Sequence, residues 1–407
     1  MKALVVAGGV PQIKLIKDMK ARGIYTVLAD GNASPVARPY ADQFYQVNIF
    51  DIEAVKKIAV DEQVDFVITV CADQVLLVVA QVSEELGLPC YIDYETAKNV
   101  SDKIRMKRIF KANGIPTTDY VETDHLDMEV IGKLRYPLVV KPVDAYSSKG
   151  VRKVCNEEEL KAFYAEAAQI SRTGGVIVEE FFSGEEISVD AFVVNGKAKV
   201  LCVTNSDKIR YDDRFVIYRG RYPAAATDEV RRKIEEIAQK IADAFGLVNS
   251  PLLIQLLDNG SEVSVLEFCA RTGGNMKYLL IQPSCGVDVI RATLDITLGL
   301  EPDLEFRETG NNVVVNDFVY CYPGVFDHVE GFDELVAEGV ISEYFLNRAK
   351  GTVMKGANSS SDRIMGINIL AGDAEEFNRK QRRIMESVRI LDVDGKDIMR
   401  RDMFNDL

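Results

Sequence analysis

The stretch VSVLEFCARTGG, residues 263–274, decides how the rest of this chain is interpreted. Its apolar run predicts a β-strand that ends near Glu267, and Arg271 follows four residues later beside Gly273 and Gly274. Mg²⁺ takes oxygen ligands and usually relies on one or two carboxylates together with nucleotide phosphates. A guanidinium presents a planar fork of donors to phosphate oxygens, and glycines let backbone approach a ligand closely. The stretch therefore favours a magnesium–nucleotide site, with an exposed glutamate and an arginine partner as the alternative.

The bulk composition is that of an ordinary soluble globular protein. The chain has 407 residues, of which 47% are hydrophobic and 28% are charged. This length exceeds what one hydrophobic core normally supports, so roughly two to four domains or subdomains are expected. The net charge of −14 argues against binding to nucleic acid or to an anionic membrane, because both require a basic surface.

The cysteines and the N-terminus indicate a cytoplasmic protein. The seven cysteines are scattered and show no CxxC spacing, so neither a disulfide framework nor a zinc site is predicted. After Met1-Lys2 the first apolar run stops at Gly8-Gly9, which is too short for a signal peptide. No later apolar run approaches the length of a membrane span, and we therefore expect no membrane partner.

Residues 1–100 alternate between strand and helix patterns, which predicts a Rossmann-like parallel sheet with helices on both faces. The expected strands are residues 3–7, 25–29 and 66–70, and the expected helices are residues 11–22, 52–60 and 74–86. Gly8-Gly9 after the first strand and Asp30 after the second invite a dinucleotide interpretation. NAD binding is nevertheless disfavoured, because Gln12 and Ile13 stand where the GxGxxG fingerprint requires further glycines.

The pattern changes after residue 100. A helix begins at Ser101 or Asp102 and stops at Asn113-Gly114, where glycine is a typical C-terminal signal. The next elements are expected to be a strand at 137–142, a polar loop at 144–150, a strand at 150–154, a helix at 157–170 and a strand at 175–182. This order predicts a small α+β unit that resembles a lid.

Two hairpins and a mixed tail follow. The first hairpin joins residues 188–194 to 198–203 across Asn195-Gly196, which is a strong turn signal. A helix is expected at 229–245, the second hairpin joins residues 252–257 to 262–268, and a β-rich extension with a helix at 374–388 begins near residue 305.

Lys141 ends an apolar strand directly ahead of the polar loop. From this place its ammonium group can reach phosphate oxygens, while loop N–H groups such as those of Ser147 and Ser148 contact the same oxygens. The alternative is a strand-end lysine that points to solvent, the usual fate of lysine.

Gln255 and Glu267 lie twelve residues apart on the two arms of the second hairpin. Side chains alternate between the faces of a strand, so both can point into one site only if the loop has an odd number of residues or the hairpin contains a bulge. A two-residue turn at Asn259-Gly260 would put them on opposite faces. The metal interpretation therefore predicts an odd-numbered loop or a bulge between Gln255 and Glu267.

The order of four motifs resembles that of the ATP-grasp superfamily of carboxylate–amine ligases, which includes amino-acid ligases and carbamoyl-phosphate-synthase-like ATP-binding proteins. The motifs are Asp102-Lys103, YPLVVKP at 136–142, VEEFFSGEE at 178–186, and Gln255 with residues 267–271. Each motif alone is weak, but four in this order are specific.

The resemblance implies a fold of mixed α/β and α+β type in three parts. These are a pre-ATP-grasp Rossmann-like domain at residues 1–100, an ATP-grasp domain at 101–305 with a lid subdomain at about 118–185, and a C-terminal domain at 306–407 that packs on the grasp core. The last part resembles the extension of the family's single-chain ligases, and family resemblance favours a homodimer.

The resemblance also implies phosphate and metal roles. Lys103 and Lys141 would bind the nucleotide phosphates. Lys141 and Arg271 would act in catalysis, with Arg271 stabilising charge on the transferred phosphoryl group. Glu267 would be the principal ligand of Mg²⁺, or of Mn²⁺ as an alternative ion, and Gln255 would be a weaker ligand.

The adenosine part of ATP would lie against the strand that begins at Glu179. The Glu179 side chain would approach the adenine amino group, the backbone of Glu180 and Phe182 would hydrogen-bond the ring, and Glu186 would bind the ribose hydroxyls. The 144–150 loop, with Ser147 and Ser148, would close over the phosphates.

Two positions depart from the family pattern. Cys269 stands where an asparagine usually helps to hold a second metal, and Gln255 stands where many members have an acid. A thiol is a poor ligand for a hard cation. The second metal would then depend on phosphates, water or a neighbour such as Asn275. Loss of catalysis is the lesser alternative, because Lys103, Lys141, Glu267 and Arg271 are retained.

The activity implied is ATP-dependent formation of an amide or peptide-like bond. A carboxylate substrate attacks the γ-phosphate to give an acyl phosphate and ADP, and an amine then displaces phosphate. The alternatives are a nucleotide-binding protein without turnover and a bicarbonate-activating carboxylase or carbamoyl-phosphate-type enzyme. A complete carbamoyl-phosphate synthetase is disfavoured, because that activity uses two grasp units and this chain has one.

Arginines in two segments are candidates for substrate binding. Arg210 and Arg214 lie in residues 207–222, where arginines and aromatics are concentrated, and Arg363 follows three serines in the tail. They could hold a carboxylate or phosphate of the substrate. The alternative is local pairing of these charges on the surface.

Overall fold

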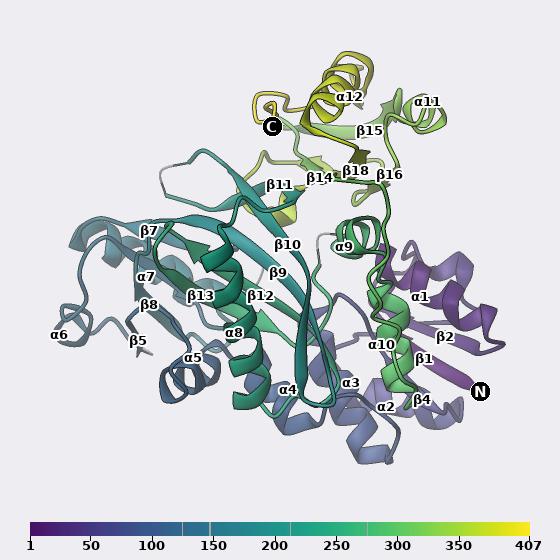
Figure 1. Cartoon of the computed structure of the whole chain (residues 1–407), viewed down its shortest axis with the longest axis horizontal. Coiled ribbons are helices and arrows are strands. Elements are labelled where there is room, and N and C mark those ends of the chain that lie inside the picture. Colours follow the sequence, from purple (N-terminus) through teal and green to yellow (C-terminus); the bar gives the residue numbers. More distant parts are fainter. Residues whose placement is uncertain (124, 146–147, 212, 275) are drawn as a thin grey trace.

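The computed structural model describes residues 1–123, 125–145, 148–211, 213–274 and 276–407. Within them the chain forms four β-sheets, and the long strands of the largest sheet run through the middle of the molecule (Figure 1). The N-terminal sheet lies on one side of these strands, and a small sheet with its own helices lies on the other. No helix in the described part of the chain is long and apolar enough to cross a membrane.

The N-terminal sheet is parallel, with the order β3-β2-β1-β4. Its strands are β1 (Lys2–Val6), β2 (Tyr25–Asp30), β3 (Gln43–Gln46) and β4 (Phe66–Ile68). Its helices are α1 (Val10–Ala21), the 3-10 helix η1 (Arg38–Tyr40), α2 (Ile52–Asp61) and α3 (Asp73–Leu86). The predicted parallel α/β unit is confirmed. The sequence does not predict strand β3, because its short sequence QFYQ carries no continuous apolar run.

Helices α4 (Tyr94–Ser101) and α5 (Lys103–Ala112) follow this unit. Of the two expected start residues, Asp102 is the N-cap of α5, and its carboxylate accepts hydrogen bonds from the N–H groups of Ile104 and Arg105. This cap satisfies helix N–H groups that would otherwise lack partners, and it places Lys103 at the first position of α5.

The small sheet has the order β5-β8-β6-β7 and is antiparallel. It contains β5 (Tyr120–Thr123), β6 (Leu138–Pro142), β7 (Arg152–Val154) and β8 (Val176–Glu180), with helices α6 (Met128–Ile131) and α7 (Glu157–Ile170). Buried side chains such as Leu138, Leu160 and Val178 form a hydrophobic cluster of their own. The expected succession of strand, loop, strand, helix and strand is present, with β5 and α6 added to it.

The central sheet has eight strands in the order β13-β12-β9-β10-β11-β14-β18-β16. Its strands are β9 (Glu185–Val194), β10 (Lys197–Ile209), β11 (Val216–Tyr222), β12 (Ser250–Asp258), β13 (Val263–Cys269), β14 (Val313–Val319), β16 (Glu343–Leu346) and β18 (Met365–Ala371). The associated helices are α8 (Asp228–Ala244), α9 (Tyr278–Cys285) and α10 (Val289–Thr297). Both predicted hairpins are present, and three strands of the tail, β14, β16 and β18, continue the same sheet.

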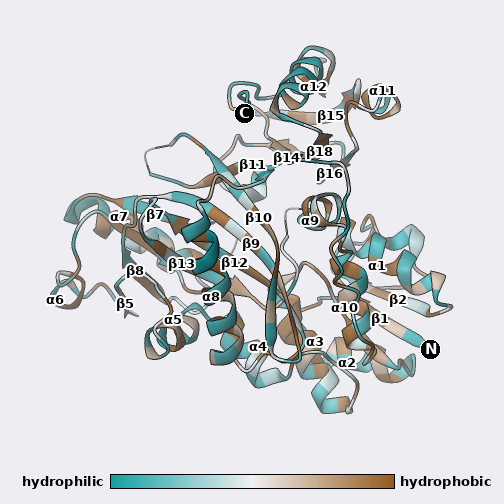
Figure 2. Cartoon of the chain, in the orientation of Figure 1, coloured by the Kyte–Doolittle hydropathy of each residue, from teal (hydrophilic) through white to brown (hydrophobic). Residues whose placement is uncertain are grey.

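The two faces of the central sheet differ in polarity. Ile187, Val189 and Ala191 of β9 belong to the same buried apolar cluster as the inner residues of α8, whose outer side is hydrophilic (Figure 2). Because successive side chains on a strand point to opposite faces, Ser188 and Asp190 lie on the other face. That polar face carries the candidate site.

The remaining tail elements form a three-stranded sheet with the order β17-β15-β19. Its strands are β15 (Gly324–Glu330), β17 (Val353–Met354) and β19 (Arg389–Asp392). The helices of the tail are α11 (Phe332–Ala337), the 3-10 helix η2 (Ser360–Asp362) and α12 (Ala374–Ser387). The predicted limits of the three domains stay a prediction.

Candidate active site

The hairpin of β12 and β13 contains the bulge that the metal interpretation requires. Gln255 pairs directly with Glu267, whereas Leu256 pairs with Val265, so Leu266 is the extra residue. Directly opposite residues of an antiparallel pair point to the same face, and Gln255 and Glu267 therefore share one side of the sheet. The geometric prediction for these two residues is confirmed.

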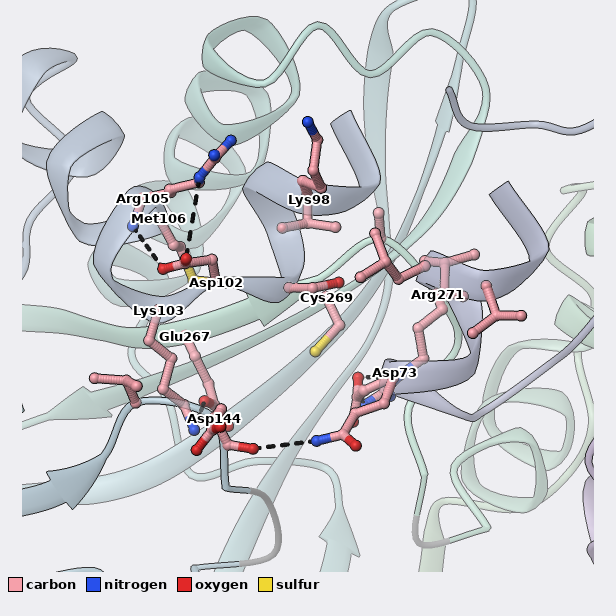
Figure 3. A pocket seen from close by; sticks show the side chains of 18 of the residues that line it. Asp73, Lys98, Asp102, Lys103, Arg105, Met106, Asp144, Glu267, Cys269 and Arg271 are labelled. Carbon is pink, nitrogen blue, oxygen red and sulfur yellow. Dashed lines mark hydrogen bonds and ion pairs between the residues drawn. The ribbon is translucent and has the colours of Figure 1, made fainter. Parts of the chain in front are cut away.

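Three adjoining cavities lie around this hairpin. The lid cavity, about 290 Å³, lies between the small sheet and the central sheet and includes Lys141, Glu179 and Leu266 in its wall. The central cavity, about 410 Å³, includes Ser188 and Lys277, and the N-terminal cavity, about 390 Å³, is shown in Figure 3. Among the residues that the structure describes, Glu267 is the one that lines all three.

Glu179 is the electrostatic centre of the lid cavity. Its carboxylate is buried, 3.0 Å from the Lys141 ammonium group and 3.2 Å from that of Lys107, and it accepts a hydrogen bond from the Thr118 hydroxyl. Burial would raise the pKa of Glu179, but the charges of Lys107 and Lys141 outweigh it and lower the pKa to about 2. Glu179 is therefore an ionised hydrogen-bond acceptor.

The two lysines beside Glu179 differ in their remaining donors. The Lys107 ammonium group contacts Glu179 and the hydroxyls of Thr117 and Thr118, so its three N–H groups have three acceptors. Lys141 has Glu179 as its partner among the described residues. Lys141 thus keeps donors for a ligand, whereas Lys107 is committed to the protein. Burial, the larger effect, lowers the pKa of Lys107 to about 8 despite the charge of Glu179.

Sequence reasoning missed Lys107. It is one of several basic residues in the run DKIRMKRIF, and its burial depends on Glu179, which lies 72 positions away. The one available signal is its position four residues after Lys103, on the same face of the helix.

Glu186 lies on the floor of the lid cavity. Its carboxylate is 2.8 Å from the Lys208 ammonium group and accepts a hydrogen bond of 3.1 Å from the side-chain amide of Gln255. Gln255 is therefore the bridge between the residue predicted to bind ribose and Glu267, its cross-strand partner.

Lys103 and Glu267 lie together at the boundary between the lid and N-terminal cavities (Figure 3). Their charged groups are 3.5 Å apart, and Lys103 also donates to the backbone oxygen of Ala145 at 2.5 Å. Glu267 remains 36% exposed in its side chain, so its carboxylate is accessible to a ligand from the cavities.

Arg271 is held by the N-terminal unit. Its buried guanidinium forms an ion pair with Asp73 at the start of α3 and donates to the backbone oxygen of Thr272 at 2.9 Å. Burial lowers the pKa of Arg271, but the Asp73 charge more than compensates and the net pKa is raised. Asp73 was not a predicted site residue, because nothing in its local sequence distinguishes it from a helix-start aspartate.

Cys269 lies in Figure 3 between the Lys103–Glu267 group and the Asp73–Arg271 pair. Burial raises the pKa of its thiol well above the ordinary value, so Cys269 is protonated at neutral pH. A neutral thiol is a poor ligand for Mg²⁺.

The other residues predicted to bind ATP differ in whether they line a cavity. Glu180 and Phe182 line the lid cavity, and the Glu180 carboxylate is paired with Arg135 at 2.9 Å. Ser148 lines the lid and central cavities with a positive φ of 57°. Ser147 lies outside the described residues.

The three arginines proposed for substrate binding do not meet at these cavities. Arg210 is exposed, and Arg214 pairs with Asp213 and donates to the Asn358 side chain at 2.9 Å. Arg363 is buried over the Phe318 ring, 4.2 Å from its centroid. In the part of the chain that the structure describes, none of the three lines any of the three cavities.

The donor set fits a metal ion that arrives with a nucleotide. No group of three or more His, Cys, Asp or Glu side chains that could hold a metal occurs within the described ranges. Glu267 supplies one accessible carboxylate and Gln255 one amide oxygen on the same face. This pair suits Mg²⁺, which usually takes its other oxygens from water and phosphates.

Comparison with known proteins agrees with the motif order. A family model described as "ATP-grasp N-terminal domain" matches residues 18–90, and one described as "D-ala D-ala ligase C-terminus" matches residues 109–267. A phosphoribosylamine–glycine ligase of Lactococcus lactis subsp. lactis is 25% identical over 311 residues, which cover 71% of each chain. A D-alanine–D-alanine ligase of Mannheimia succiniciproducens is 30% identical over 180 residues, or 42% of this chain and 57% of that protein.

The fold has close counterparts among solved structures. The L-amino acid ligase from Bacillus licheniformis superimposes with a TM-score of 0.81 at 20% identity, covering 96% of this chain and 98% of that one. At this identity the likeness concerns the fold. Together with the two family matches and the arrangement of the motifs around Glu267, it places this chain in the ATP-grasp superfamily of ligases.

Proposed function

We propose that the protein is an ATP-dependent carbon–nitrogen ligase that releases ADP. It activates a small-molecule carboxylate as an acyl phosphate and joins it to an amine, forming an amide or peptide-like bond. The lid cavity binds ATP, and the central cavity binds the carboxylate substrate that receives the γ-phosphoryl group. Use of ATP with Mg²⁺ is a property of ATP-grasp enzymes.

The observation that carries the proposal is the position of Glu267 at the junction of the three cavities. A group that joins a nucleotide cavity to a substrate cavity must lie where the phosphoryl group passes from one to the other. Glu267 lies there beside Lys103 and opposite Gln255. A bound Mg²⁺ would supply positive charge at the phosphate oxygens at this place.

The protein's own residues then orient the reactants. Lys141, which keeps unused donors, binds phosphate oxygens, and Glu179 accepts a hydrogen bond from the adenine amino group. Arg271, fixed by Asp73, faces the cavities where negative charge develops on the transferred group. Charge stabilisation of this kind is the main contribution that a protein makes to phosphoryl transfer.

The chemistry needs no protein nucleophile. A carboxylate oxygen forms a bond to the γ-phosphorus, and the bond to the β-phosphate oxygen breaks with release of ADP. The amine nitrogen then bonds to the acyl carbon, phosphate leaves, and the nitrogen loses a proton. Neither His125 nor His328 lines any of the three cavities within the described ranges.

The test is a coupled assay of ADP release over a matrix of carboxylates and amines with Mg²⁺. We expect ADP release that requires one carboxylate and one amine together, with an amide product of the corresponding mass. Adding hydroxylamine in place of the amine should trap the acyl group as a hydroxamate. ADP release that depends on bicarbonate alone would instead favour the carboxylase alternative, and ATP binding without turnover would favour a nucleotide-binding protein.

A further inference from the structure

The polar face of the central sheet carries a continuous row of side chains that extends away from Glu267. Gln255 pairs with Glu267 on one side and with Ser188 on the other, and Ser188 pairs with Thr204. The row therefore crosses four strands, from β13 through β12 and β9 to β10. Neighbouring strands are about 4.8 Å apart, so its two ends are separated by roughly 14 Å.

Lys277 lies over the far end of this row. Its ammonium group donates a hydrogen bond of 2.6 Å to the Thr204 hydroxyl, and its side chain lines the central cavity that Gln255 and Glu267 also line. Its other charged neighbour is Asp190, at 3.6 Å, which is too far for a good hydrogen bond. Among the described residues, two of the three N–H donors of Lys277 thus have no hydrogen-bond partner.

The surroundings of Lys277 point to a ligand. Asp190 is only 2% exposed, and neither of its carboxylate oxygens has a hydrogen-bond partner in the described part of the chain. A buried carboxylate without hydrogen bonds is costly, and the ammonium group of Lys277 is the charged group that lies beside it, behind the cavity wall. Gly273 permits this arrangement, because a Cβ there would lie 2.5 Å from the Lys277 side chain.

Unused hydroxyl groups lie next to the lysine. Ser188 and Ser206 line the central cavity, and within the described ranges neither hydroxyl makes a hydrogen bond to another residue. Arg271 is the other cation of this cavity, but its guanidinium is already paired with Asp73. Lys277, Ser188 and Ser206 together therefore form a place in the central cavity where, among the described residues, hydrogen-bond donors are free.

We propose that Lys277, with Ser188 and Ser206, binds a second anionic group of the substrate, one that takes no part in the reaction and lies about 10–14 Å from the reacting carboxylate or amine. The proposal rests on the proposed function and adds a substrate class to it: one of the two substrates carries an additional carboxylate or phosphate. Lys277, together with these hydroxyls, is then a residue that determines specificity at the end of the cavity remote from ATP.

A binding experiment tests this without turnover. The affinities of a series of α,ω-dicarboxylates of increasing length, and of their monoamides, are measured by calorimetry on the full chain with MgADP present. We expect one length to bind about tenfold or more tightly than its monoamide, because a charge-assisted hydrogen bond is lost in the amide. In Lys277→Met this ratio should fall to about one, and Lys277→Arg should restore part of it.

Two further variants keep the test decisive. Lys199→Met removes an exposed lysine of the same strand β10 as Thr204 and should leave the ratio unchanged. If Lys277→Met does not fold, Ser206→Asp serves instead, because a carboxylate placed beside the lysine should abolish the preference for the dianion while MgADP binding stays intact. Equal affinities for dicarboxylate and monoamide at every length, or an unchanged ratio in the variants, would overturn the proposal.

The same compounds separate this proposal from the ligase activity. A dianion preference that depends on Lys277, in a protein that never releases ADP, would refute the ligase and leave the anion subsite standing. ADP release from neutral and anionic substrates with the same KM would refute the subsite and leave the ligase standing.

Discussion

Asp73 and Arg271 lie 198 positions apart in the sequence and form an ion pair. Asp73 belongs to the first turn of α3 in the N-terminal unit, whereas Arg271 follows the last strand of the hairpin that carries Glu267. The orientation of the predicted catalytic arginine is therefore set by a part of the chain that contributes little to the lid cavity.

We predict that Asp73→Asn lowers kcat at least tenfold and changes KM for ATP by less than about threefold. The amide cannot hold the guanidinium by charge, and small displacements of a catalytic group are costly. Steady-state kinetics of ADP release checks this. Asp51→Asn, which alters a helix-capping aspartate in α2 that asparagine can replace, is the matched control and should retain full activity.

We predict that Glu267→Gln abolishes substrate-dependent ADP release, by at least about a hundredfold, without unfolding the protein. Glu267 is partly exposed and lies two residues before the end of β13, so its amide should fit the folded structure. The melting temperature and the rate are measured together. Glu262→Gln, in the exposed loop of the same hairpin, is the control, and full turnover by Glu267→Gln would refute the metal assignment.

We predict that Lys141→Ala weakens MgATP binding by about tenfold or more, because the removed ammonium group loses charge-assisted contacts with phosphate. Calorimetric titration with MgATP measures the change in Kd. Lys133→Ala, an exposed lysine of the same small unit, should bind normally. An unchanged Kd in Lys141→Ala would show that this lysine serves Glu179 alone.

Stability at acid pH should depend on Glu179. Its pKa is lowered from an ordinary 4.5 to about 2, so the unfolded carboxyl binds a proton at a higher pH than the folded one. The contribution of this group to the free energy of unfolding is present above pH 4.5 and is lost as the pH falls through about 2. Urea unfolding between about pH 6 and pH 3 should therefore show a shallower pH dependence for Glu179→Gln than for the unaltered protein.

The sequence predicts those parts of the site that lie in local motifs. Glu267 is visible because a carboxylate ends an apolar strand beside arginine and glycines, and the need for a bulge near it follows from side-chain alternation. The parallel N-terminal sheet is visible because its strands are continuous apolar runs. Strand β3 is not, because QFYQ lacks one.

The parts that escaped prediction depend on contacts between distant segments. Lys107 and Lys277 look like ordinary surface lysines in the sequence, and each is buried beside an acid from a strand that is distant in the sequence. The position of Asp190 does have a signal in the sequence. Glu186, Ser188 and Asp190 alternate with apolar residues, which predicts a strand with one polar face. That face turned out to be the floor of the site.

The continuation of the central sheet into the tail has a practical consequence. Strand β11 is covered by β14, which belongs to the last hundred residues of the chain. A chain shortened at residue 305 would keep every residue predicted to bind ATP, yet it would present the unpaired edge of β11 to solvent. Such an edge is a template for pairing with other chains, and we expect the shortened protein to aggregate rather than to behave as a smaller working enzyme.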